Sequence, residues 1–388
     1  MELSNIGLLL YCLYTYHSFE WGGGVVKIVS ISFVPIEYIG VKKKLDSQYE
    51  AFQDCSDESD YFRFSGDGYF FNDKLLLKTS IGNKYLRKIQ DVFIFIKILR
   101  SLPKDVDLIY IRYMRITPWF FFFLRKLKLN CKNLVLEIPS YPYDKEYPNK
   151  DILSFSDNFF RTKLDRFVDL ITYYGDEFDS IFGVKCLRIT NGVSLSDNPL
   201  IVKDSIESGR ALNFVAVANL AKWHGYDCFL NSIAIYVNKY SQDIHFHIIG
   251  SGAELTELVE LTSKLNIDKN VTFHGPKSGK ELDLLYNKMD VAICSLGLYR
   301  IGHDLLSPLK PAEYIARGLP IVLANNDDRF CGSENFIYRA PNNDSLLDVK
   351  SIIEWYLNND KAPSEIRKYA QDNLTWNQQL YKVIKKIV

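Results

Sequence analysis

Strand-length apolar runs recur along the chain, and stretches with helical periodicity separate most of them. Alternating strands and helices are typical of parallel sheets, because each helix covers a face of the sheet that it crosses. The runs fall into two groups, at 27–34, 108–113, 133–138, 170–174 and 186–190, and at 213–218, 245–250, 271–275, 291–295 and 320–324. The pattern predicts an α/β protein with two parallel sheets.

Two domains fit the length and the composition. A chain of 388 residues is too long for one ordinary core, and its 47% apolar residues can fill two. The polar segment 198–211 separates the two groups of strands. We therefore expect one domain over 26–205, a second over 206–370, and a final helical segment over 371–388.

Residues 1–25 differ from the rest of the chain. Their apolar run IGLLLYCLY follows Glu2 and has no Lys or Arg before it, so it lacks the basic start of a signal peptide. After WGGG the chain reads VVKIVSISFV, which resembles the start of an ordinary enzyme. We expect residues 1–25 to be an upstream extension, with Val26 as an alternative start.

Charge and cysteine content exclude several classes of protein. The chain has 47 Lys and Arg against 47 Asp and Glu, which argues against a nucleic-acid-binding protein. Its seven cysteines form no C-x-x-C pair, as expected in a reducing compartment. No window reaches the roughly 18 consecutive apolar residues that a membrane span needs. We expect a cytoplasmic protein, and contact with the inner face of the plasma membrane stays open.

The stretch SPLKPAEYIARGLPIV, 307–322, predicts a helix over 308–317 with Ser307 as its N-cap and Pro308 in its first position. Lys310, Glu313 and Arg317 then share one polar stripe. One interpretation is a solvated face with a Glu313–Arg317 surface pair. The other is a binding site, because ligands of parallel sheets gather beyond the carboxyl ends of the strands, where helices begin.

A resemblance favours the binding site. The block VAICSLGLYRIGHDLLSPLKPAEYIARGLPIVLAN is similar to the donor-binding signature of the retaining GT-B glycosyltransferases of family four, also called group 1. Further stretches resemble the family's motifs in the right order, at 27–52, 188–193, 214–230, 247–258 and 271–276. The resemblance covers 26–388. It implies two Rossmann-like domains that face each other across a cleft, and a C-terminal helix that crosses back onto the first.

The resemblance also implies roles for residues. Lys310 and the backbone N–H groups of Leu309 and Lys310 would hold the departing diphosphate, where negative charge grows in the transition state. Glu313 would accept hydrogen bonds from the ribose hydroxyls. The other donor-binding residues that it implies are Gly40, Asn219, Lys222, His224, Gly225, Gly250, Gly252, Gly275, Pro276 and Ser307.

The chain departs from the family in two places. Leu305 stands where the first glutamate of the family's E-x7-E signature is expected, with His303 and Asp304 as neighbours. In the phosphate loop, Asn219 and His224 replace the usual arginine and lysine, with Lys222 between them. Whether Leu305 abolishes or redirects recognition of the donor sugar stays open, and one alternative is that Asp304 or His303 takes the place of the glutamate.

The acceptor side has weaker signals. The family often places a histidine at the end of a first-domain strand, but LEIPSYPYDKEY, 136–147, has none. Glu137 and Asp144 are the predicted catalytic residues here, and Tyr141 and Asp144 are predicted to face the acceptor. The alternative is a stiff structural loop, because two prolines lie within it. Lys42, Lys43 and Lys44 are expected to be a solvated helix start.

No metal or cofactor is expected. The D-x-D segment, Asp105-Val106-Asp107, precedes a strand and so falls at the wrong end of the sheet for a ligand site. Cationic side chains and helix N-termini can replace a metal ion beside phosphates.

The segment WFFFFLRKLKLNCK, 119–132, has two interpretations. It is either a core helix with a basic outer edge or a surface that brings the protein to a membrane that holds its acceptor.

The sequence therefore predicts a retaining glycosyltransferase that moves a sugar from a nucleotide sugar to a glycan or lipid-linked glycan, in the synthesis of a capsule, O-antigen or exopolysaccharide. Two alternatives stay open. One is another GT-B enzyme, such as a nucleotide-sugar epimerase or a sugar phosphorylase. The other is a non-catalytic GT-B subunit that binds nucleotide or glycan, which Leu305 and the altered phosphate loop favour.

Overall fold

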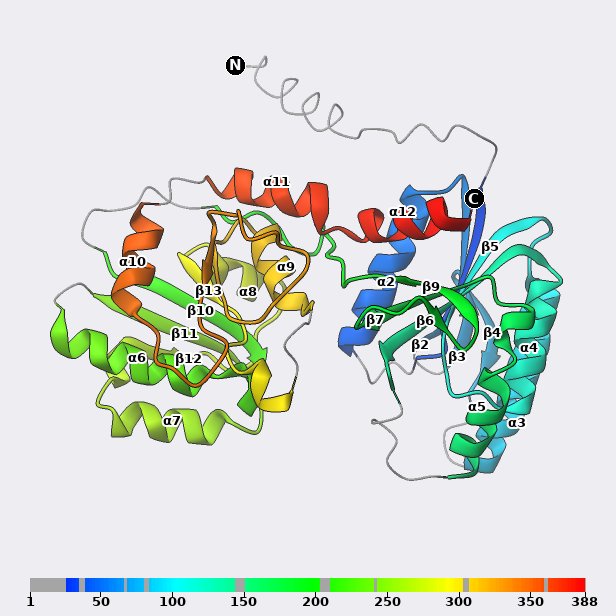
Figure 1. The fold of residues 1–388 in the computed structure, drawn as a ribbon, viewed down its shortest axis with the longest axis horizontal. Coiled ribbons are helices and arrows are strands. Elements are labelled where there is room, and N and C mark those ends of the chain that lie inside the picture. Colours follow the sequence, from blue (N-terminus) through cyan, green and yellow to red (C-terminus); the bar gives the residue numbers. More distant parts are fainter. Residues whose placement is uncertain are drawn as a thin grey trace, which may run out of the picture.

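The structure is a computed structural model. It describes residues 26–34, 39–65, 68–79, 84–143, 151–202, 210–240, 243–302, 307–358 and 362–387. Within these ranges the chain forms two α/β domains that lie side by side, each around its own sheet (Figure 1). This two-domain, Rossmann-like arrangement confirms the predicted fold class.

The first domain is built on a nine-stranded sheet in the order β4-β3-β2-β1-β5-β6-β7-β9-β8. Its strands are β1 (Lys27–Ile31), β2 (Glu58–Ser65), β3 (Gly68–Phe71), β4 (Lys74–Lys78), β5 (Val106–Arg112), β6 (Cys131–Tyr141), β7 (Leu170–Gly175), β8 (Ser180–Ile181) and β9 (Val184–Arg188). From β2 to β9 the central strands run parallel, whereas β3, β4 and β8 pair antiparallel. The helices are α2 (Ile39–Asp54), α3 (Lys84–Ser101), α4 (Pro118–Lys128) and α5 (Ile152–Arg161).

Helix α4 shows why this domain holds together. Thr117 caps its start by accepting from the Phe120 N–H, and Pro118 occupies a first-turn position, which needs no amide donor. The apolar side chains on its inner face are buried, and Phe123 stacks on Phe95 of α3 at 4.4 Å between ring centroids. The core-helix interpretation of 119–132 is therefore correct for this inner face.

The second domain has a six-stranded sheet in the order β12-β11-β10-β13-β14-β15, all parallel. The strands are β10 (Leu212–Asn219), β11 (Ile244–Ser251), β12 (Val271–Phe273), β13 (Val291–Ile293), β14 (Ile321–Leu323) and β15 (Ile337–Arg339). The helices are α6 (Tyr226–Lys239), α7 (Leu255–Lys264), α8 (Gly279–Tyr286), α9 (Leu309–Ala316), α10 (Val349–Leu357) and α11 (Pro363–Asn373). Two short 3-10 turns matter below, η3 (Lys222–His224) and η5 (Leu298–Ile301).

Both sheets contain a switch point, where the strand order reverses direction. In the first sheet it lies between β1 and β5, and in the second between β10 and β13. Ligands of open parallel sheets bind beyond the carboxyl ends of the strands at such points. The topology therefore marks one position in each domain for a binding site.

Two segments of chain connect the domains, and they pair with each other. Val193 and Thr375 form a parallel bridge, and the Val193 N–H donates to the Leu374 carbonyl at 2.8 Å. Beside this bridge Gly192 lies against Trp376, where a Cβ on Gly192 would be 2.7 Å from the Trp376 nitrogen. Only glycine therefore fits at position 192.

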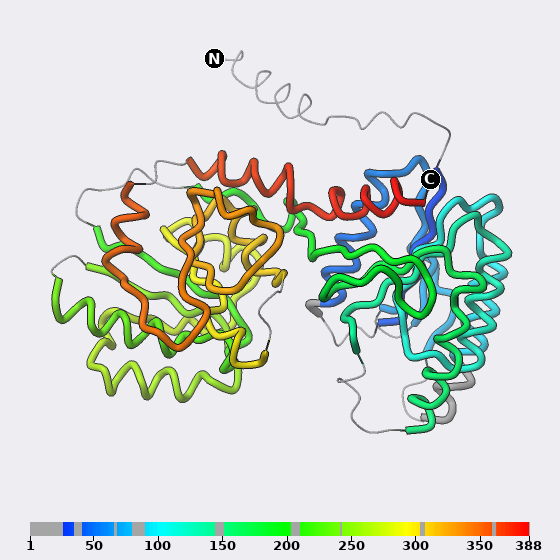
Figure 2. The backbone as a smooth tube through the Cα atoms, viewed as in Figure 1, coloured from blue at the N-terminus to red at the C-terminus, as the bar shows by residue number. Residues whose placement is uncertain are grey.

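The last helix, α12 (Trp376–Ile387), returns to the first domain and packs on α2. Figure 2 traces this return, with the red end of the chain beside the blue helix α2. Its buried side chains join a core with Ile28, Phe52 and Val135, and they are Trp376, Leu380, Val383 and Ile384. The C-terminal helix thus crosses back, as the predicted fold class includes.

We expect Leu380→Ala to lower the free energy of unfolding by about 2–5 kcal/mol, because it opens a cavity at a position with no exposed surface. Chemical denaturation measures this change. Lys385→Ala, on the exposed side of the same helix, is the control and should change stability by less than about 0.5 kcal/mol. Equal stability of the two variants would mean that α12 is not docked on the first domain in solution.

Candidate active site

The loops at the carboxyl edge of the second sheet are tied together by backbone hydrogen bonds. The Leu220 N–H donates to Ser251 O at 2.7 Å, joining the ends of β10 and β11, and the Gly250 N–H donates to Gly275 O at 2.9 Å. Across the switch point, the Leu296 N–H donates to His224 O at 2.8 Å. The predicted donor residues on these loops therefore lie along one edge of the sheet.

Helix α9 begins differently from the sequence prediction. Pro308, with φ −62° and ψ 157°, is the N-cap residue, and the helix starts at Leu309. The predicted N-cap role of Ser307 is wrong, because its hydroxyl donates to Asp328 Oδ1 at 3.1 Å instead. A contact distant in sequence has taken the side chain that the local pattern assigned to the cap.

Lys310 and Glu313 form an ion pair on α9, with 2.7 Å between Nζ and Oε2. Burial alone would raise the pKa of Glu313, but the Lys310 ammonium outweighs it and lowers that pKa below its usual value. Glu313 is therefore an ionised carboxylate with little exposed surface. Lys43 of α2, in the other domain, adds to the lowering of this pKa and lies 3.6 Å from Asp197 Oδ2.

The alternative pair between Glu313 and Arg317 is not formed. The Arg317 guanidinium is buried and donates to Asp283 Oδ1 at 2.7 Å and to the Asp197 carbonyl at 3.3 Å. Arg317 thus secures the C-terminal end of α9 within the domain. The polar stripe divides into a structural arginine and a Lys310–Glu313 pair near the start of the helix.

Arg329 fixes the start of α9, and the sequence analysis missed it. Its guanidinium donates to Pro308 O at 2.6 Å and to Asn191 O at 3.0 Å, while Asp327 pairs with it at 2.5 Å. Asn191 in turn donates through Nδ2 to Ser307 O at 3.1 Å. These contacts join the N-terminus of α9 to the segment that connects the domains. No local motif marks Arg329, because the two carbonyl groups to which it donates are distant in sequence.

Arg300 is a second residue that the sequence analysis did not single out. It donates to Asp227 Oδ1 at 2.8 Å, to Asp344 Oδ1 at 2.6 Å and to Lys222 O at 2.9 Å. These bonds hold η5 against η3 and the start of α6. The loops after β10 and β13 are thereby fixed to each other at the switch point.

His224 helps to shape the loop after β10. Its Nδ1 lies 3.1 Å from both the nitrogen and the oxygen of Ala221, and its ring stacks on Tyr226. Burial, with a smaller effect of the Lys310 charge, lowers the pKa of His224 below its usual value. His224 is therefore neutral at pH 7, so it does not supply the positive charge of the family residue that it replaces.

The remaining predicted donor residues occupy the same edge. Asn219 ends β10 and is exposed, Lys222 lies exposed in η3, and Gly225 precedes α6. Gly250 has a φ of +134°, and a Cβ there would lie 1.9 Å from Ala218 O of β10. Packing against β10 is therefore a sufficient reason for glycine at this position, without any ligand. Gly252, Gly275 and Pro276 lie in the loops after β11 and β12, whereas Gly40 lies in the first turn of α2 in the other domain.

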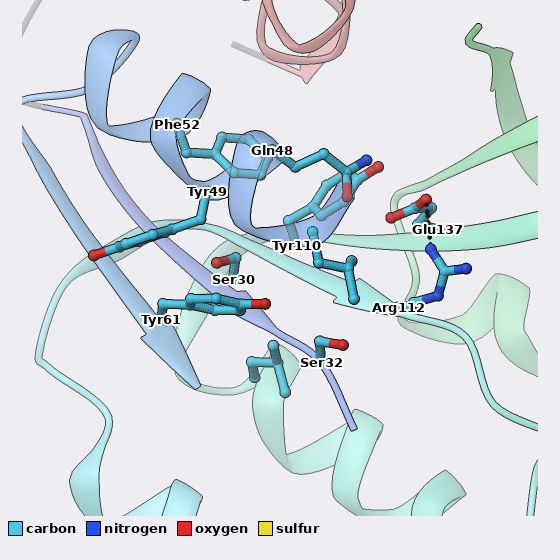
Figure 3. Close-up of a pocket in the computed structure, with 11 residues that line it drawn as sticks. Ser30, Ser32, Gln48, Tyr49, Phe52, Tyr61, Tyr110, Arg112 and Glu137 are labelled. Carbon is cyan, nitrogen blue, oxygen red and sulfur yellow. Dashed lines mark hydrogen bonds and ion pairs between the residues drawn. The ribbon is translucent and has the colours of Figure 1, made fainter. Parts of the chain in front are cut away.

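A polar cavity lies at the switch point of the first domain, between α2 and the sheet (Figure 3). Ser30 and Ser32 line it from β1 and the residue after it, Arg112 from the end of β5, and Gln48 from α2. Three of the residues that line it have a buried oxygen without a hydrogen-bond partner among the described residues, namely Ser30 Oγ, Gln48 Oε1 and Glu137 Oε2. Buried polar atoms normally have partners, so the cavity, with a volume of about 10 Å³, suits one water-sized group that donates hydrogen bonds.

Glu137 lies in the wall of this cavity and has no exposed surface. Its Oε1 accepts from Arg112 and from the Tyr174 hydroxyl, both at 3.1 Å, and lies 3.4 Å from Lys44 Nζ. Burial would raise the pKa of Glu137, but Lys44 and Arg112 lower it overall, so the carboxylate is ionised. Burial lowers the pKa of Lys44 to about 8. The expectation that Lys44 belongs to a solvated helix start is therefore wrong.

The other predicted acceptor residues are not gathered around this cavity. Tyr141 packs against Phe178, with 4.9 Å between ring centroids, and faces a cluster of aromatic rings. Asp144 lies outside the described residues, as do His303, Asp304 and Leu305. Their predicted roles stay predictions.

The D-x-D segment is occupied by structural contacts. Asp107 accepts from the Lys27 N–H at 2.8 Å and pairs with Lys132 at 2.6 Å, at the amino end of β5. Among the described residues, no three His, Cys, Asp or Glu side chains are grouped as metal ligands would be. In the same part of the chain, no helix is long and apolar enough to cross a membrane.

Comparison with known proteins agrees with this geometry. Residues 211–348 match the family described as Glycosyl transferases group 1. An uncharacterized glycosyltransferase of Haemophilus influenzae is 25% identical over 237 residues, which are 61% of this chain and 62% of that protein. The match thus spans less than two thirds of that relative's length.

Solved structures resemble this chain over nearly its whole length. A glycosyltransferase from Rickettsia africae has a TM-score of 0.61 and 14% identity, covering 94% of this chain and 98% of its own. The Anabaena protein HepE, in complex with UDP and glucose, has a TM-score of 0.55 and 14% identity over 93% of this chain and 100% of its own. At these identities the structures establish the fold. The chain therefore has a GT-B fold, and its residues 211–348 match the family described as Glycosyl transferases group 1.

Proposed function

We propose that the protein transfers a sugar from a nucleotide sugar to a hydroxyl group of an acceptor, with retention at the anomeric carbon. The observation that carries this proposal is the Lys310–Glu313 pair near the start of α9, at the carboxyl edge of the second sheet. A nucleoside diphosphate offers an anion for Lys310 and ribose hydroxyls for Glu313. HepE, whose structure contains UDP and glucose, supports this class of ligand.

The chemistry needs positive charge on one side of the reacting bond. As the nucleoside diphosphate departs, negative charge grows on its phosphate oxygens, and donors aimed at that charge stabilise the transition state. In this proposal the Lys310 ammonium and the first N–H groups of α9 provide these donors. The helix dipole adds about 0.3–1 kcal/mol in their favour. Arg329 and Asn191 act on the reaction only by fixing where α9 begins.

The acceptor would enter from the first domain. A hydroxyl group can donate a hydrogen bond to the buried oxygens of Ser30, Gln48 and Glu137. This gives the polar cavity a place in the reaction as part of the acceptor side. We further propose a glycan or lipid-linked glycan as acceptor, cytoplasmic action and a role in cell-surface polysaccharide synthesis.

Two substitutions on α9 test the donor site. Glu313→Gln should weaken nucleotide binding by about 10- to 150-fold, because it removes charge-assisted hydrogen bonds of about 1.5–3 kcal/mol. Lys310→Met should lower turnover more than it weakens donor binding, because its charge acts on the leaving group. Calorimetry with nucleoside diphosphates and a transfer assay measure the two effects.

The control is Glu354→Gln on α10, since Glu354 forms an exposed surface pair with Lys350 in the same domain. It should change neither quantity. If both α9 variants stay within about twofold of the parent in binding and transfer, the donor-site assignment fails. A non-catalytic binding subunit would show the Glu313 effect and no turnover.

We also propose that transfer needs no metal ion, because Lys310 and the α9 N-terminus take the part that a divalent cation plays elsewhere. Excess chelator should leave the initial rate nearly unchanged. Loss of activity on chelation, with recovery on addition of manganese or magnesium, would contradict this.

Glu137→Gln separates a structural from a catalytic role. The substitution leaves Lys44 and Arg112 buried without their anion, so the free energy of unfolding should fall by about 3–5 kcal/mol. Urea denaturation measures this. Unchanged stability together with a large loss of turnover would instead make Glu137 a catalytic residue of the acceptor side, as the sequence first indicated.

A further inference from the structure

Large apolar side chains are exposed along neighbouring helices of the first domain. On α4, Trp119 is 61% and Phe122 53% exposed, and on α5, Ile152 is 90% and Phe155 78% exposed. We call this surface the aromatic face, and its members are Phe93, Ile96, Trp119, Phe122, Leu129, Ile152, Phe155 and Phe159. An exposed group of this kind is unusual in a soluble domain and marks an interaction surface.

The aromatic face is rigid because its helices are anchored from below. Phe95 of α3 stacks on Phe123 of α4, and Phe121 of α4 packs on Phe160 of α5 with 4.8 Å between ring centroids. Asp157, buried on α5, accepts from the Ile116 N–H at 2.6 Å. The three helices thus form one layer on the side of the first domain that is turned away from the second (Figure 1).

The exposed residues are spaced as stripes. Trp119 and Phe122 on α4 and Leu129, its C-cap residue, recur at helical intervals, and Ile152, Phe155 and Phe159 do so on α5. Helix α4 therefore buries one apolar side in the domain and presents a second apolar side to the outside, whereas on α5 only Asp157 is buried and Phe160 is half-buried. Packing within the chain explains the first side only.

Charges of both signs lie around the aromatic face, since Asp151 beside Ile152 pairs with Arg115 and Asp169 pairs with Lys128, but the charges of α4 itself are basic. The α4 sequence has Arg125, Lys126 and Lys128 and no acidic residue, and Arg125 and Lys126 are exposed one turn after Phe122. Beyond α5, the Lys163 ammonium lies 3.4 Å from the centre of the Phe159 ring. Because the whole chain carries no net charge, this cluster is a local feature.

The aromatic face also adjoins the acceptor edge. Helix α4 follows the carboxyl end of β5 and α5 follows that of β6, so Trp119 and Ile152, in the first turns, lie toward the edge at which Arg112 and the polar cavity are found. An acceptor held at this surface would need to travel only a short way to the cavity.

We propose that the aromatic face docks on an anionic lipid bilayer. Aromatic and aliphatic side chains enter the headgroup region, and the neighbouring cations attract anionic lipids. Each such cation raises the affinity for the bilayer severalfold. This inference rests on the proposed function for its purpose, which is to bring the site to an acceptor carried by a lipid. The docking itself does not depend on sugar transfer.

Flotation of the full chain with vesicles, without any sugar donor, tests the docking. We expect binding to phosphatidylcholine vesicles that contain phosphatidylglycerol, and much weaker binding to pure phosphatidylcholine. The variant Trp119→Ser/Phe122→Ser/Phe155→Ser and the variant Arg125→Glu/Lys126→Glu should each lower the bound fraction by about tenfold. Their unfolding temperatures should match the parent, because the altered side chains are exposed.

Matched controls lie on the second domain. Ile235, Leu284 and Leu357 are exposed to similar extents, and their joint replacement by Ser should leave vesicle binding unchanged. The same holds for Lys264→Glu/Lys269→Glu on the exposed side of that domain.

Two outcomes would overturn the proposal. One is a parent protein that binds neither kind of vesicle. The other is self-association, detected by light scattering and abolished by the triple Ser variant, which would make the aromatic face a contact between copies of the chain. If the protein binds vesicles but neither binds nucleotide nor transfers sugar, the proposed function is wrong and the docking proposal still holds.

Discussion

The structure depends on the pairing between the two segments that connect its domains. The Val193–Thr375 bridge and the contact of Gly192 with Trp376 hold these segments together. The domains are therefore connected by two paired segments of chain. Through Asn191 and Arg329 the same junction holds the first residues of α9. The position of the proposed donor site is therefore coupled to the connection between the domains, since any shift at the junction also moves the helix start.

Each domain contributes a different kind of chemistry at its own switch point. The second domain presents an ion pair on a helix start, with loops fixed by Arg300. The first domain presents buried oxygens that have no hydrogen-bond partner in the described part of the chain, beside a carboxylate held by Lys44 and Arg112. One side suits an anionic ligand and the other a ligand that donates hydrogen bonds. This asymmetry matches the proposed reaction, in which a sugar moves from a nucleotide sugar to a hydroxyl group and the nucleoside diphosphate leaves.

Elements with a clear hydrophobic periodicity could be predicted from the sequence. Contacts between residues that lie far apart along the chain could not. All the strands expected from apolar runs formed, but β2, β3, β4, β8 and β15 were missed. β2 mixes charges with aromatics, β3 and β4 turn at Asn72 with a φ of +51°, and β8 and β15 are only two and three residues long. The Lys310–Glu313 spacing was recognisable, whereas Arg329 and the Ser307–Asp328 contact were not, since they arise only when loops far apart along the chain meet. The burial of Lys44 likewise depends on Glu137, almost a hundred residues away.

The Lys310–Glu313 ion pair has a consequence for selectivity. Without a ligand, each of the two charges already satisfies the other at 2.7 Å. An inorganic anion that drew the ammonium away would leave the carboxylate less compensated, and a free sugar that drew the carboxylate away would leave the ammonium less compensated. If the donor site is assigned correctly, a ligand that brings an anion and hydroxyl groups together replaces both halves at once. The apo pair would then discriminate against the cell's abundant phosphate before any contact with the base or the donor sugar is made.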